Sequence, residues 1–315
     1  METYTSGPLN HYRRPKFNNE LATRIVGGHC VLASIIGICF NVFMFFHFLS
    51  LEKLSFYILC TSKTVSNTLS LLVYLTYIGP ANLFYTSIGS MTFNARLQQI
   101  FGFGLFLQGP MTELLVTVNR FVIIIFSPTK IPTYSAKITV FALAATWCFA
   151  IWLSWLPGFP DYCFVQFAFD HVGYYESDCS QEVVLWLIFI IFPLALFNNA
   201  MNFILGAKLI VLAKRQRHMT SSEAAKRRRN QTIKFFIQSV IQDWMTALVA
   251  GSNMLLTTFY CKLHTCIILT TFTIDSLVYC FDGIIMFVFN YKIPRKVEVA
   301  APSTSKMFSS RASMA

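Results

Sequence analysis

Residues 25–49 read IVGGHCVLASIIGICFNVFMFFHFL, a run of 25 residues without a single Asp, Glu, Lys or Arg. About 20 apolar residues in a helix are enough to cross the roughly 30 Å hydrocarbon core of a bilayer. A cleavable signal peptide has an apolar region of only about 7–15 residues followed by a small-residue cleavage site, and this segment has neither. The run therefore predicts a first membrane span that is retained in the protein.

Comparable runs recur along the chain and predict an all-α membrane protein. Of the 315 residues, 55% are hydrophobic and only 12% are charged, whereas about a quarter are charged in soluble domains. Strands of a membrane β-barrel would be about 10 residues of alternating polarity, and these runs are longer and more continuous. We predict one bundle domain, residues 25–290, whose seven helical spans are about 25–49, 54–78, 97–127, 136–157, 183–213, 231–259 and 264–290.

Lysine and arginine are distributed unequally between the two ends of this bundle. Six of the 25 fall on the side of the amino terminus, and the other 19 fall on the opposite side. Cytoplasmic loops are enriched in these residues, so we expect the tail 1–24 to be extracellular. The tail 291–315 should then be cytoplasmic and disordered. The net charge of +11 reflects a cytoplasmic face near anionic membrane lipid and is not evidence for nucleic-acid binding.

Within the third predicted span, the stretch TVNRFVIIIF (117–126) places Arg120 among apolar residues. The span ends near Pro128, eight residues later and about 12 Å along the helix axis, so the guanidinium should lie close to the cytoplasmic interface. One interpretation is that Arg120 extends its side chain to the lipid headgroups and merely sets the topology. The other is that it belongs to a functional site, and the surrounding motifs favour this second interpretation.

The order of these motifs resembles that of the rhodopsin-like G-protein-coupled receptors. Asn119-Arg120-Phe121 stands at the inner end of the third span, where that family has Asp-Arg-Tyr. Asn41 is similar to the family's helix-one asparagine, and Asp282 begins a segment similar to its helix-seven Asn-Pro-x-x-Tyr motif. Three further residues occupy similar positions: Trp147, Pro157 and Pro193.

A more specific resemblance is to nematode chemosensory receptors of the serpentine receptor class x type. FYILCTSKTVSN (56–67), ELLVTVNRFVIIIFSP (113–128) and the loop pair Cys163 and Cys179 carry this resemblance, which covers about residues 25–292. It implies a plasma-membrane receptor, displayed on sensory-neuron cilia, that binds a small environmental or pheromone-like ligand and activates a heterotrimeric G protein. It also implies arrestin-type binding to a phosphorylated carboxy-terminal tail, and it implies neither a cofactor nor an enzymatic reaction.

Two departures from the rhodopsin-like pattern affect what can be transferred. Ala95 stands where those receptors usually have the cysteine that is bridged to the second outer loop, so we favour a disulfide between Cys163 and Cys179. Other pairings stay open, because three more cysteines lie near the same face: Cys30, Cys261 and Cys266. Asn119 replaces an acid, so Arg120 lacks a charged local partner and is expected to rely on hydrogen bonds.

Four acids lie within the predicted spans, where carboxylates are costly and generally mark partners, pathways or protonation sites. Glu113 precedes Arg120 by two helical turns on one face, and Asp275 and Asp282 stand in the same relation on the seventh span. The fourth acid is Asp243. We predict a packed polar core in which Glu113 and Asp282 are neutral or hydrogen-bonded, or one that changes its protonation or hydration on activation. The expected partners are Asn41, Lys63, Ser66 and Asn67.

The outer half of the bundle holds candidate ligand-binding residues. Asp275 lies near the middle of its span, and Phe103, Phe106 and Leu107 share one face of the third span, outward of Glu113. Such aromatic stripes are often only packing. If they line a cavity, it favours an apolar, volatile-sized ligand held by few polar groups. The acidic, aromatic-rich loop 158–182 is either a lid over this site or an ordinary outer loop.

Other classes of membrane protein compete with a receptor. A ligand-gated channel or a small-molecule transporter is the main alternative, although the sequence shows no matching halves of the kind found in many transporters. An intramembrane enzyme is disfavoured, because the six histidines are scattered without a metal-binding spacing or an acid at matching depth. The basic segment 214–234 is expected to lie near lipid headgroups and the G protein.

Overall fold

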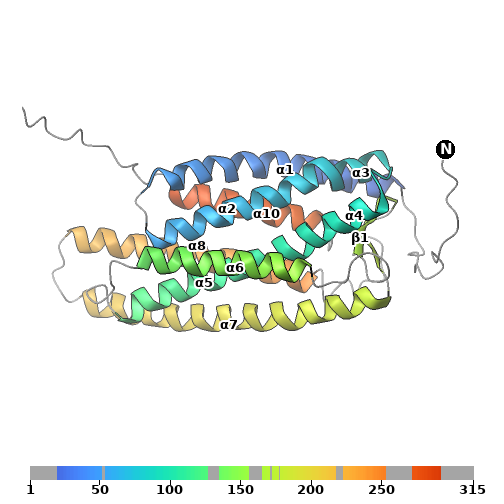
Figure 1. Cartoon of the computed structure of the whole chain (residues 1–315). Helices are drawn as coiled ribbons and strands as arrows, with labels where there is room; N and C mark the ends of the chain where they lie inside the picture. The colour runs from blue at the N-terminus through green and yellow to red at the C-terminus, as the bar shows by residue number, and fades with distance from the viewer. Residues whose placement is uncertain are drawn as a thin grey trace, which may run out of the picture.

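The computed structural model describes residues 20–51, 54–126, 135–155, 165–170, 172–176, 178–217, 223–252 and 272–291. In these ranges the chain forms a bundle of long helices with one short β-hairpin at an end of the bundle (Figure 1). The start of α1 (Glu20–Leu49) and the start of α7 (Asp178–Arg217) lie at the hairpin end. The end of α7 and the start of α8 (Glu223–Ala250) lie at the opposite end.

The described helices make up seven rods, two of which contain a wider π-helical segment. The second rod consists of α2 (Ser55–Val73), the π-helical segment Tyr74–Ile78 and α3 (Gly79–Phe84). The third rod consists of α4 (Met91–Leu97), the π-helical segment Gln98–Leu105 and α5 (Phe106–Phe126). The five uninterrupted rods are α1, α6 (Ser135–Ser154), α7, α8 and α10 (Phe272–Asn290).

Each predicted span overlaps one of these rods, so the prediction of an all-α seven-helix bundle is confirmed. The fifth and sixth rods begin earlier than the apolar runs that predicted them. In α8 the additional turns read EAAKRRRN, and these residues are mostly strong helix formers. The helix therefore continues beyond the part of the chain that is apolar enough to be recognised as a span. The π-helical segment of the second rod ends at Ile78, two residues before Pro80, and a proline within a helix removes one backbone hydrogen bond.

Length and composition separate the rods into two groups. Five described helical stretches are long and apolar enough to cross a membrane: Glu20–Leu49, Met91–Val122, Ala136–Ser154, Phe189–Val211 and Phe272–Asn290. The rods that contain α2 and α8 do not reach this level, because each has buried polar residues along one side. These two rods supply much of the polar interior described below.

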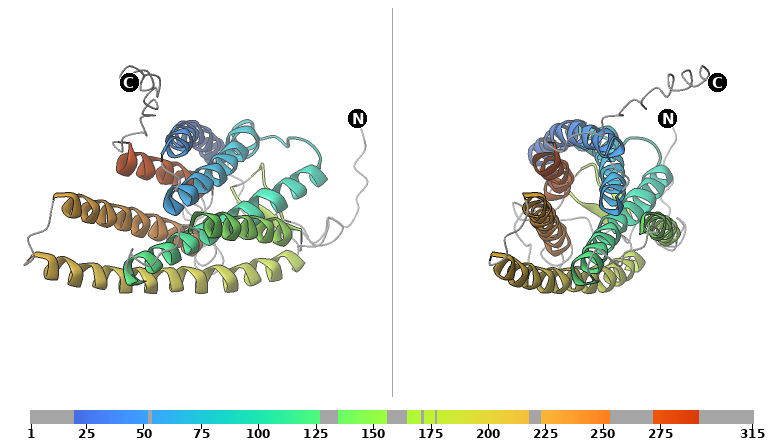
Figure 2. Two further views of the ribbon diagram at one scale, coloured as in Figure 1. Left: turned by 60° about the vertical axis from the view of Figure 1, so that its left-hand side comes forward. Right: turned by 90° about the vertical axis from the view of Figure 1, so that its left-hand side faces the viewer.

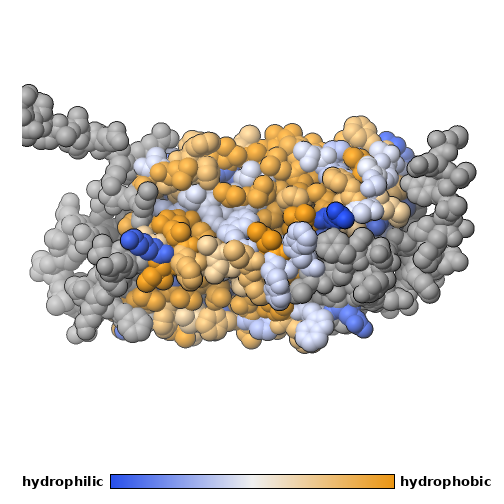
Figure 3. Space-filling view, viewed as in Figure 1, coloured by the Kyte–Doolittle hydropathy of each residue, from blue (hydrophilic) through white to orange (hydrophobic). Residues whose placement is uncertain are grey.

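Small residues let α1 approach the second rod closely. A Cβ atom added to Gly27 would lie only 2.3 Å from the backbone nitrogen of Leu83, and one added to Gly79 would lie 3.3 Å from the carbonyl oxygen of Gly27. Only glycine fits at such a contact, which is a common device for packing helices in membranes. The described helices of the face shown in Figure 3 are largely apolar, as expected of a surface in contact with lipid. Seen end on, α6 lies at the periphery of the bundle (Figure 2).

The β-hairpin formed by β1 (Val165–Phe167) and β2 (Tyr174–Glu176) comes from the loop 158–182. Phe167 packs against Tyr77 of the second rod and Phe272 of α10. Asn94 of α4 holds the same residue by its backbone: Asn94 Nδ2 donates to the Phe167 carbonyl at 2.8 Å, and the Phe167 N–H donates to Asn94 Oδ1 at 2.9 Å. The hairpin therefore lies on the ends of helices, while a lid function for the loop stays a prediction.

A tyrosine on this hairpin is held neutral by its surroundings. The Tyr175 hydroxyl donates a short hydrogen bond to Asp170. Partial burial, and then the hydrogen bond and the negative charge of Asp170, raise the pKa of Tyr175. The phenol therefore stays protonated across the physiological pH range.

Candidate functional site: two charged layers inside the bundle

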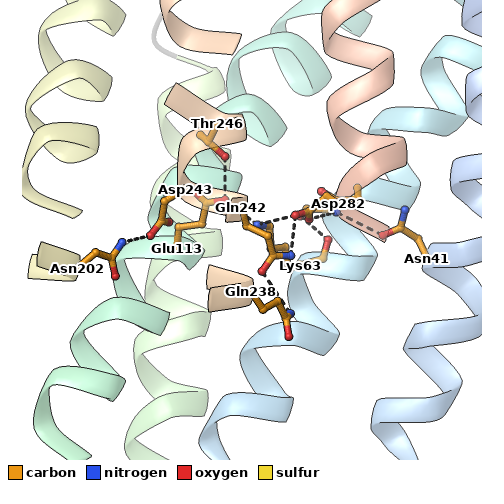
Figure 4. A network of polar contacts seen from close by, with 11 residues as sticks. Asn41, Lys63, Glu113, Asn202, Gln238, Gln242, Asp243, Thr246 and Asp282 are labelled. Carbon is orange, nitrogen blue, oxygen red and sulfur yellow. Dashed lines mark hydrogen bonds and ion pairs between the residues drawn. The ribbon is translucent and has the colours of Figure 1, made fainter. Parts of the chain in front are cut away.

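A lysine near the centre of the bundle holds carboxylates from two other helices. Lys63 Nζ of α2 lies 2.6 Å from Glu113 Oε1 of α5 and 3.0 Å from Asp282 Oδ1 of α10 (Figure 4). All three residues are at most 6% exposed. An uncompensated charge at this depth would be very costly, so the ion pairs explain how a lysine and two acids can share an apolar interior.

Asparagine side chains complete the bonding of Asp282. Asn67 Nδ2 donates to Asp282 Oδ2 at 2.5 Å and lies 3.3 Å from Asn41 Oδ1. Asn41 Nδ2 in turn donates to the carbonyl oxygens of Gly37 and Tyr279, at 2.8 and 3.2 Å. The structure thus brings both acids, Glu113 and Asp282, together with two of their expected partners, Asn41 and Asn67.

Two of the expected partners need separate comment. Lys63 donates a hydrogen bond to Glu113, as expected, and it also forms ion pairs with both acids. Ser66 was expected to bond to an acid, but its hydroxyl donates to the backbone carbonyl of Lys63, at 3.0 Å. Serine in a helix commonly bonds to a carbonyl of the preceding turn, and this contact satisfies the hydroxyl without reaching the core.

The sixth rod is bonded to the same carboxylates. Thr246 Oγ1 of α8 donates to Glu113 Oε1 at 2.8 Å, and Gln242 Nε2 donates to Asp282 Oδ1 at 2.7 Å (Figure 4). We call Lys63, Asn67, Glu113, Gln242, Thr246 and Asp282 the Lys63 layer. Further toward the end of α10, Asn290 Nδ2 donates to Gln238 Oε1 at 2.9 Å, which extends the contact between α8 and α10.

Arg120 lies two helical turns beyond Glu113 on α5, and its side chain is enclosed by the bundle. It is 6% exposed, and its guanidinium carbon lies 5.0 Å from the centre of the Phe56 ring. Among the described residues, no hydrogen-bond partner is found for any of its three guanidinium nitrogens. The side chain therefore does not extend to the headgroups, and within the described ranges a cation–π contact takes the place of the expected hydrogen bonds.

A second buried carboxylate lies near this guanidinium. Asp243 of α8 is 3% exposed, and one of its oxygens accepts a hydrogen bond from the Asn202 amide of α7. Its other oxygen has no hydrogen-bond partner within the described part of the chain. Asp243 and Arg120 are close enough to interact electrostatically. We call Arg120, Asn202 and Asp243 the Arg120 layer.

The buried atoms without hydrogen-bond partners in this region are donors on one helix and acceptors on the helices that face it. Counting only the described residues, α5 contributes donors without acceptors, on Asn119 and Arg120. The facing helices α7 and α8 contribute acceptors without donors, on Asn198, Asn202 and Asp243. A buried polar group without a partner costs about 1–3 kcal/mol, and a charged one costs more. A rearrangement or solvent that joins the two sets would therefore be strongly favoured.

The candidate ligand-binding residues fall into two separate clusters. Asp275 Oδ2 accepts a hydrogen bond from the Tyr74 hydroxyl at 3.1 Å, next to Phe272 and below the hairpin. Leu107 is fully buried in another cluster, with Val165 of the hairpin and Ile191 of α7, and Phe106 packs against it. Phe103 belongs to the π-helical segment of the third rod, but its side chain is outside the described set.

Two other predicted features are only partly covered by the structure. Phe121 continues α5 beyond Arg120 and is half-buried. Cys179 lies in the first turn of α7, whereas Cys163 is outside the described residues. The disulfide between these cysteines therefore stays a prediction.

Comparison with known proteins gives a family and a fold. Residues 31–290 match the family described as "Serpentine type 7TM GPCR chemoreceptor Srx". A crystal structure of squid rhodopsin is similar to this structure with a TM-score of 0.62, at 16% sequence identity, over 91% of this chain and 86% of that chain. At this identity the likeness shows the fold alone. No curated protein sequence matches the chain.

The family match spans most of the seven-helix bundle, from within α1 to the end of α10. It includes every residue of the Lys63 and Arg120 layers. Receptors of this family cross the membrane several times and are not enzymes. The chain therefore belongs to the Srx family of serpentine type seven-transmembrane G-protein-coupled chemoreceptors.

Proposed function

We propose that this chemoreceptor binds a small environmental or pheromone-like ligand in the outer half of its bundle and activates a heterotrimeric G protein at its cytoplasmic face. The observation that carries the proposal is the state of Arg120: a buried cation at the inner part of α5 whose guanidinium has no hydrogen-bond partner among the described residues. The amino terminus would be extracellular, and the receptor would act at the plasma membrane of sensory-neuron cilia.

Energetics support an exchange of partners by Arg120. Its described contact, the face of the Phe56 ring, is worth about 0.5–2 kcal/mol. A hydrogen bond to a charged group is worth about 1.5–3 kcal/mol, and a guanidinium can donate several of them. Carbonyl or carboxylate groups of a G protein could therefore bind Arg120 more strongly than the ring does. Separation of the inner ends of α7 and α8 would admit them.

The outer half supplies the proposed ligand contacts. Its two clusters are mainly aromatic and aliphatic, with Asp275 and Tyr74 as a polar pair next to one and Leu107 within the other. This composition supports an apolar ligand with few polar groups. The hairpin contributes to both clusters, through Phe167 and Val165 respectively, so a ligand that displaced it would disturb both at once.

The test is heterologous expression with a G-protein readout over a panel of volatiles and metabolites. The wild type should respond to a member of the panel, and Arg120→Ala should lose the response while its surface expression is maintained. Arg24→Ala removes an exposed arginine whose described ion pair is with Glu20 of its own helix, and it should leave the response intact. An unchanged response in Arg120→Ala would remove the proposed mechanism.

The same cells distinguish the receptor from a ligand-gated channel or a transporter. Ligand-dependent current or uptake, with no nucleotide exchange on any Gα subunit, would overturn the proposal. Epitopes at residues 5 and 310 test the orientation: intact cells should expose the first and conceal the second. Recruitment of arrestin to the tail 291–315 can be followed in the same assay.

A further inference from the structure

We propose that Gln242 and Thr246 form a latch that holds α8 against α5 and α10 and thereby sets the basal activity of the receptor, with Lys63 as its positioning residue. The regulatory part of this inference rests on the proposed function, whereas the contact itself can be tested without a G protein. The name latch refers below to these two side chains of α8 and to the hydrogen bonds that they donate.

The geometry of the latch restrains α8 in two directions. Gln242 and Thr246 are four residues apart, so they lie on one face of the helix, one turn from each other. Thr246 donates to Glu113 of α5 and Gln242 donates to Asp282 of α10, at 2.8 and 2.7 Å. A rotation of α8, or an outward displacement of its inner half, would break both hydrogen bonds.

Lys63 fixes the particular atoms that the latch uses. Glu113 Oε1, which accepts from Thr246, is also the atom that binds Lys63 Nζ. Asp282 Oδ1, which accepts from Gln242, is likewise the atom paired with Lys63. The lysine thus holds both acceptor oxygens in position for α8. It is a positioning residue in this sense, because it acts on the helix through the two carboxylates.

The same arrangement limits the free-energy cost of moving α8 away from α5 and α10. If α8 moves away, each carboxylate loses one donor but stays within ion-pair distance of Lys63. The polar cost within the Lys63 layer is then two hydrogen bonds to charged groups, each of which shifts an equilibrium by roughly tenfold or more. The neutral hydrogen bond between Asn290 and Gln238 adds a smaller cost. A ligand that binds the open state a few hundred times more tightly could supply such a shift.

The experiment compares four variants of the full-length receptor in lipid nanodiscs. Thr246→Val removes the hydroxyl and keeps the shape, whereas Thr246→Ser keeps the hydroxyl. Thr76→Val makes the same chemical change at an exposed threonine whose hydroxyl bonds only to the carbonyl of Leu72 in its own helix, as far as the described contacts go. Gln242→Leu removes the other hydrogen bond of the latch, the one donated to Asp282.

Hydrogen–deuterium exchange of the α8 amides gives a readout that is independent of any partner, because exchange follows local opening. We expect the α8 amides to exchange about tenfold faster in Thr246→Val and in Gln242→Leu than in the wild type. Thr246→Ser and Thr76→Val should exchange at the wild-type rate. Basal nucleotide exchange on purified heterotrimeric G proteins should rise in the same two variants and in no other.

The outcomes separate the latch from the proposed function. The latch would be overturned, whatever the coupling result, if the α8 amides of Thr246→Val exchanged hydrogen for deuterium at the wild-type rate. It would also be overturned if Thr246→Val and Thr246→Ser increased that rate equally. Faster exchange of α8 without a rise in basal nucleotide exchange, in a receptor whose wild type couples when stimulated, would overturn its regulatory role. Faster α8 exchange in a receptor that couples to no G protein under any condition would confirm the contact and overturn the proposed function.

Discussion

The Lys63 layer and the Arg120 layer lie two turns apart on α5, and they handle buried charge differently. In the Lys63 layer one ammonium serves two carboxylates, and donors from α2 and α8 bind the same acids. In the Arg120 layer a guanidinium and one carboxylate oxygen are buried without hydrogen bonds among the described residues. A satisfied network specifies one arrangement, whereas an unsatisfied one favours a second arrangement. The comparison indicates that the first layer maintains the fold and the second is prepared to change partners.

Lys63→Met gives the largest effect expected from this comparison. Removing one partner of a buried ion pair typically costs about 3–5 kcal/mol, and here two carboxylates would be left together. We expect a large drop in the melting temperature of the purified receptor and low surface expression. Adding Glu113→Gln and Asp282→Asn to this variant should recover much of the stability, because no charge then remains in the layer. A Lys63→Met receptor that melts like the wild type would contradict the assigned role.

Gly283→Ala tests the packing around the same layer. A Cβ atom at Gly283 would lie 2.5 Å from Asn41 Nδ2, so the Asn41 amide would have to move away from Asn67. We expect a loss of about 1–3 kcal/mol in the free energy of unfolding, the usual cost of overpacking a core. Gly109→Ala is the matched control, because a Cβ atom there would meet nothing within 4 Å. Equal melting temperatures for the two variants would refute the steric argument.

Asp243→Asn should have a smaller effect, because it removes a charge that the described residues satisfy only in part. Asparagine keeps the shape of the side chain and an oxygen that can accept from Asn202. We expect the free energy of unfolding to change by about 1 kcal/mol or less, as for an ordinary hydrogen bond. Chemical denaturation beside Glu113→Gln provides the measurement. A loss as large as that of Glu113→Gln would show that the layers do not differ.

Arg120→Met is expected to have the smallest effect on stability and a complete effect on signalling. Methionine retains most of the apolar stem, and the described residues lose the contact with the Phe56 ring and the electrostatic attraction to Asp243, neither of which includes a hydrogen bond. The melting temperature should stay the same or rise slightly, while ligand-induced nucleotide exchange on Gα disappears. Arg120→Lys keeps the charge without the planar fork and should couple weakly. A clear drop in the melting temperature of Arg120→Met would show that the guanidinium stabilises the resting bundle.

The seven rods could be predicted from the sequence because each contains an apolar run, whose length is fixed by bilayer thickness. The composition of the polar core could also be predicted, since acids within spans must find partners. The sharing of Lys63 by Glu113 and Asp282 could not be predicted from the sequence, because the relative depth and rotation of three helices depend on packing between distant segments. Gln242 and Thr246 were missed, although their spacing of four residues within a mostly apolar run was a usable signal.

The separation of Asp275 from Leu107 has a similar cause. Both lie in the outer half, but the face that each helix turns to its neighbours is decided by contacts such as the close approach of Gly37 to Cys280 of α10, where a Cβ atom would lie 2.9 Å from the Cys280 Cα atom. The hairpin was not expected at all, because strands of three residues have no readable alternation.

Asn94 gives the outer hairpin a further significance. By bonding both backbone groups of Phe167, its amide fastens the hairpin to the rod that continues into α5 and carries Arg120. A molecule that tilts the hairpin would pull on that rod through the Asn94 side chain, in addition to disturbing the two buried clusters that the hairpin joins. The contact with a ligand near one membrane surface and the contact of Arg120 with a G protein near the other would then be made by the same continuous helical rod.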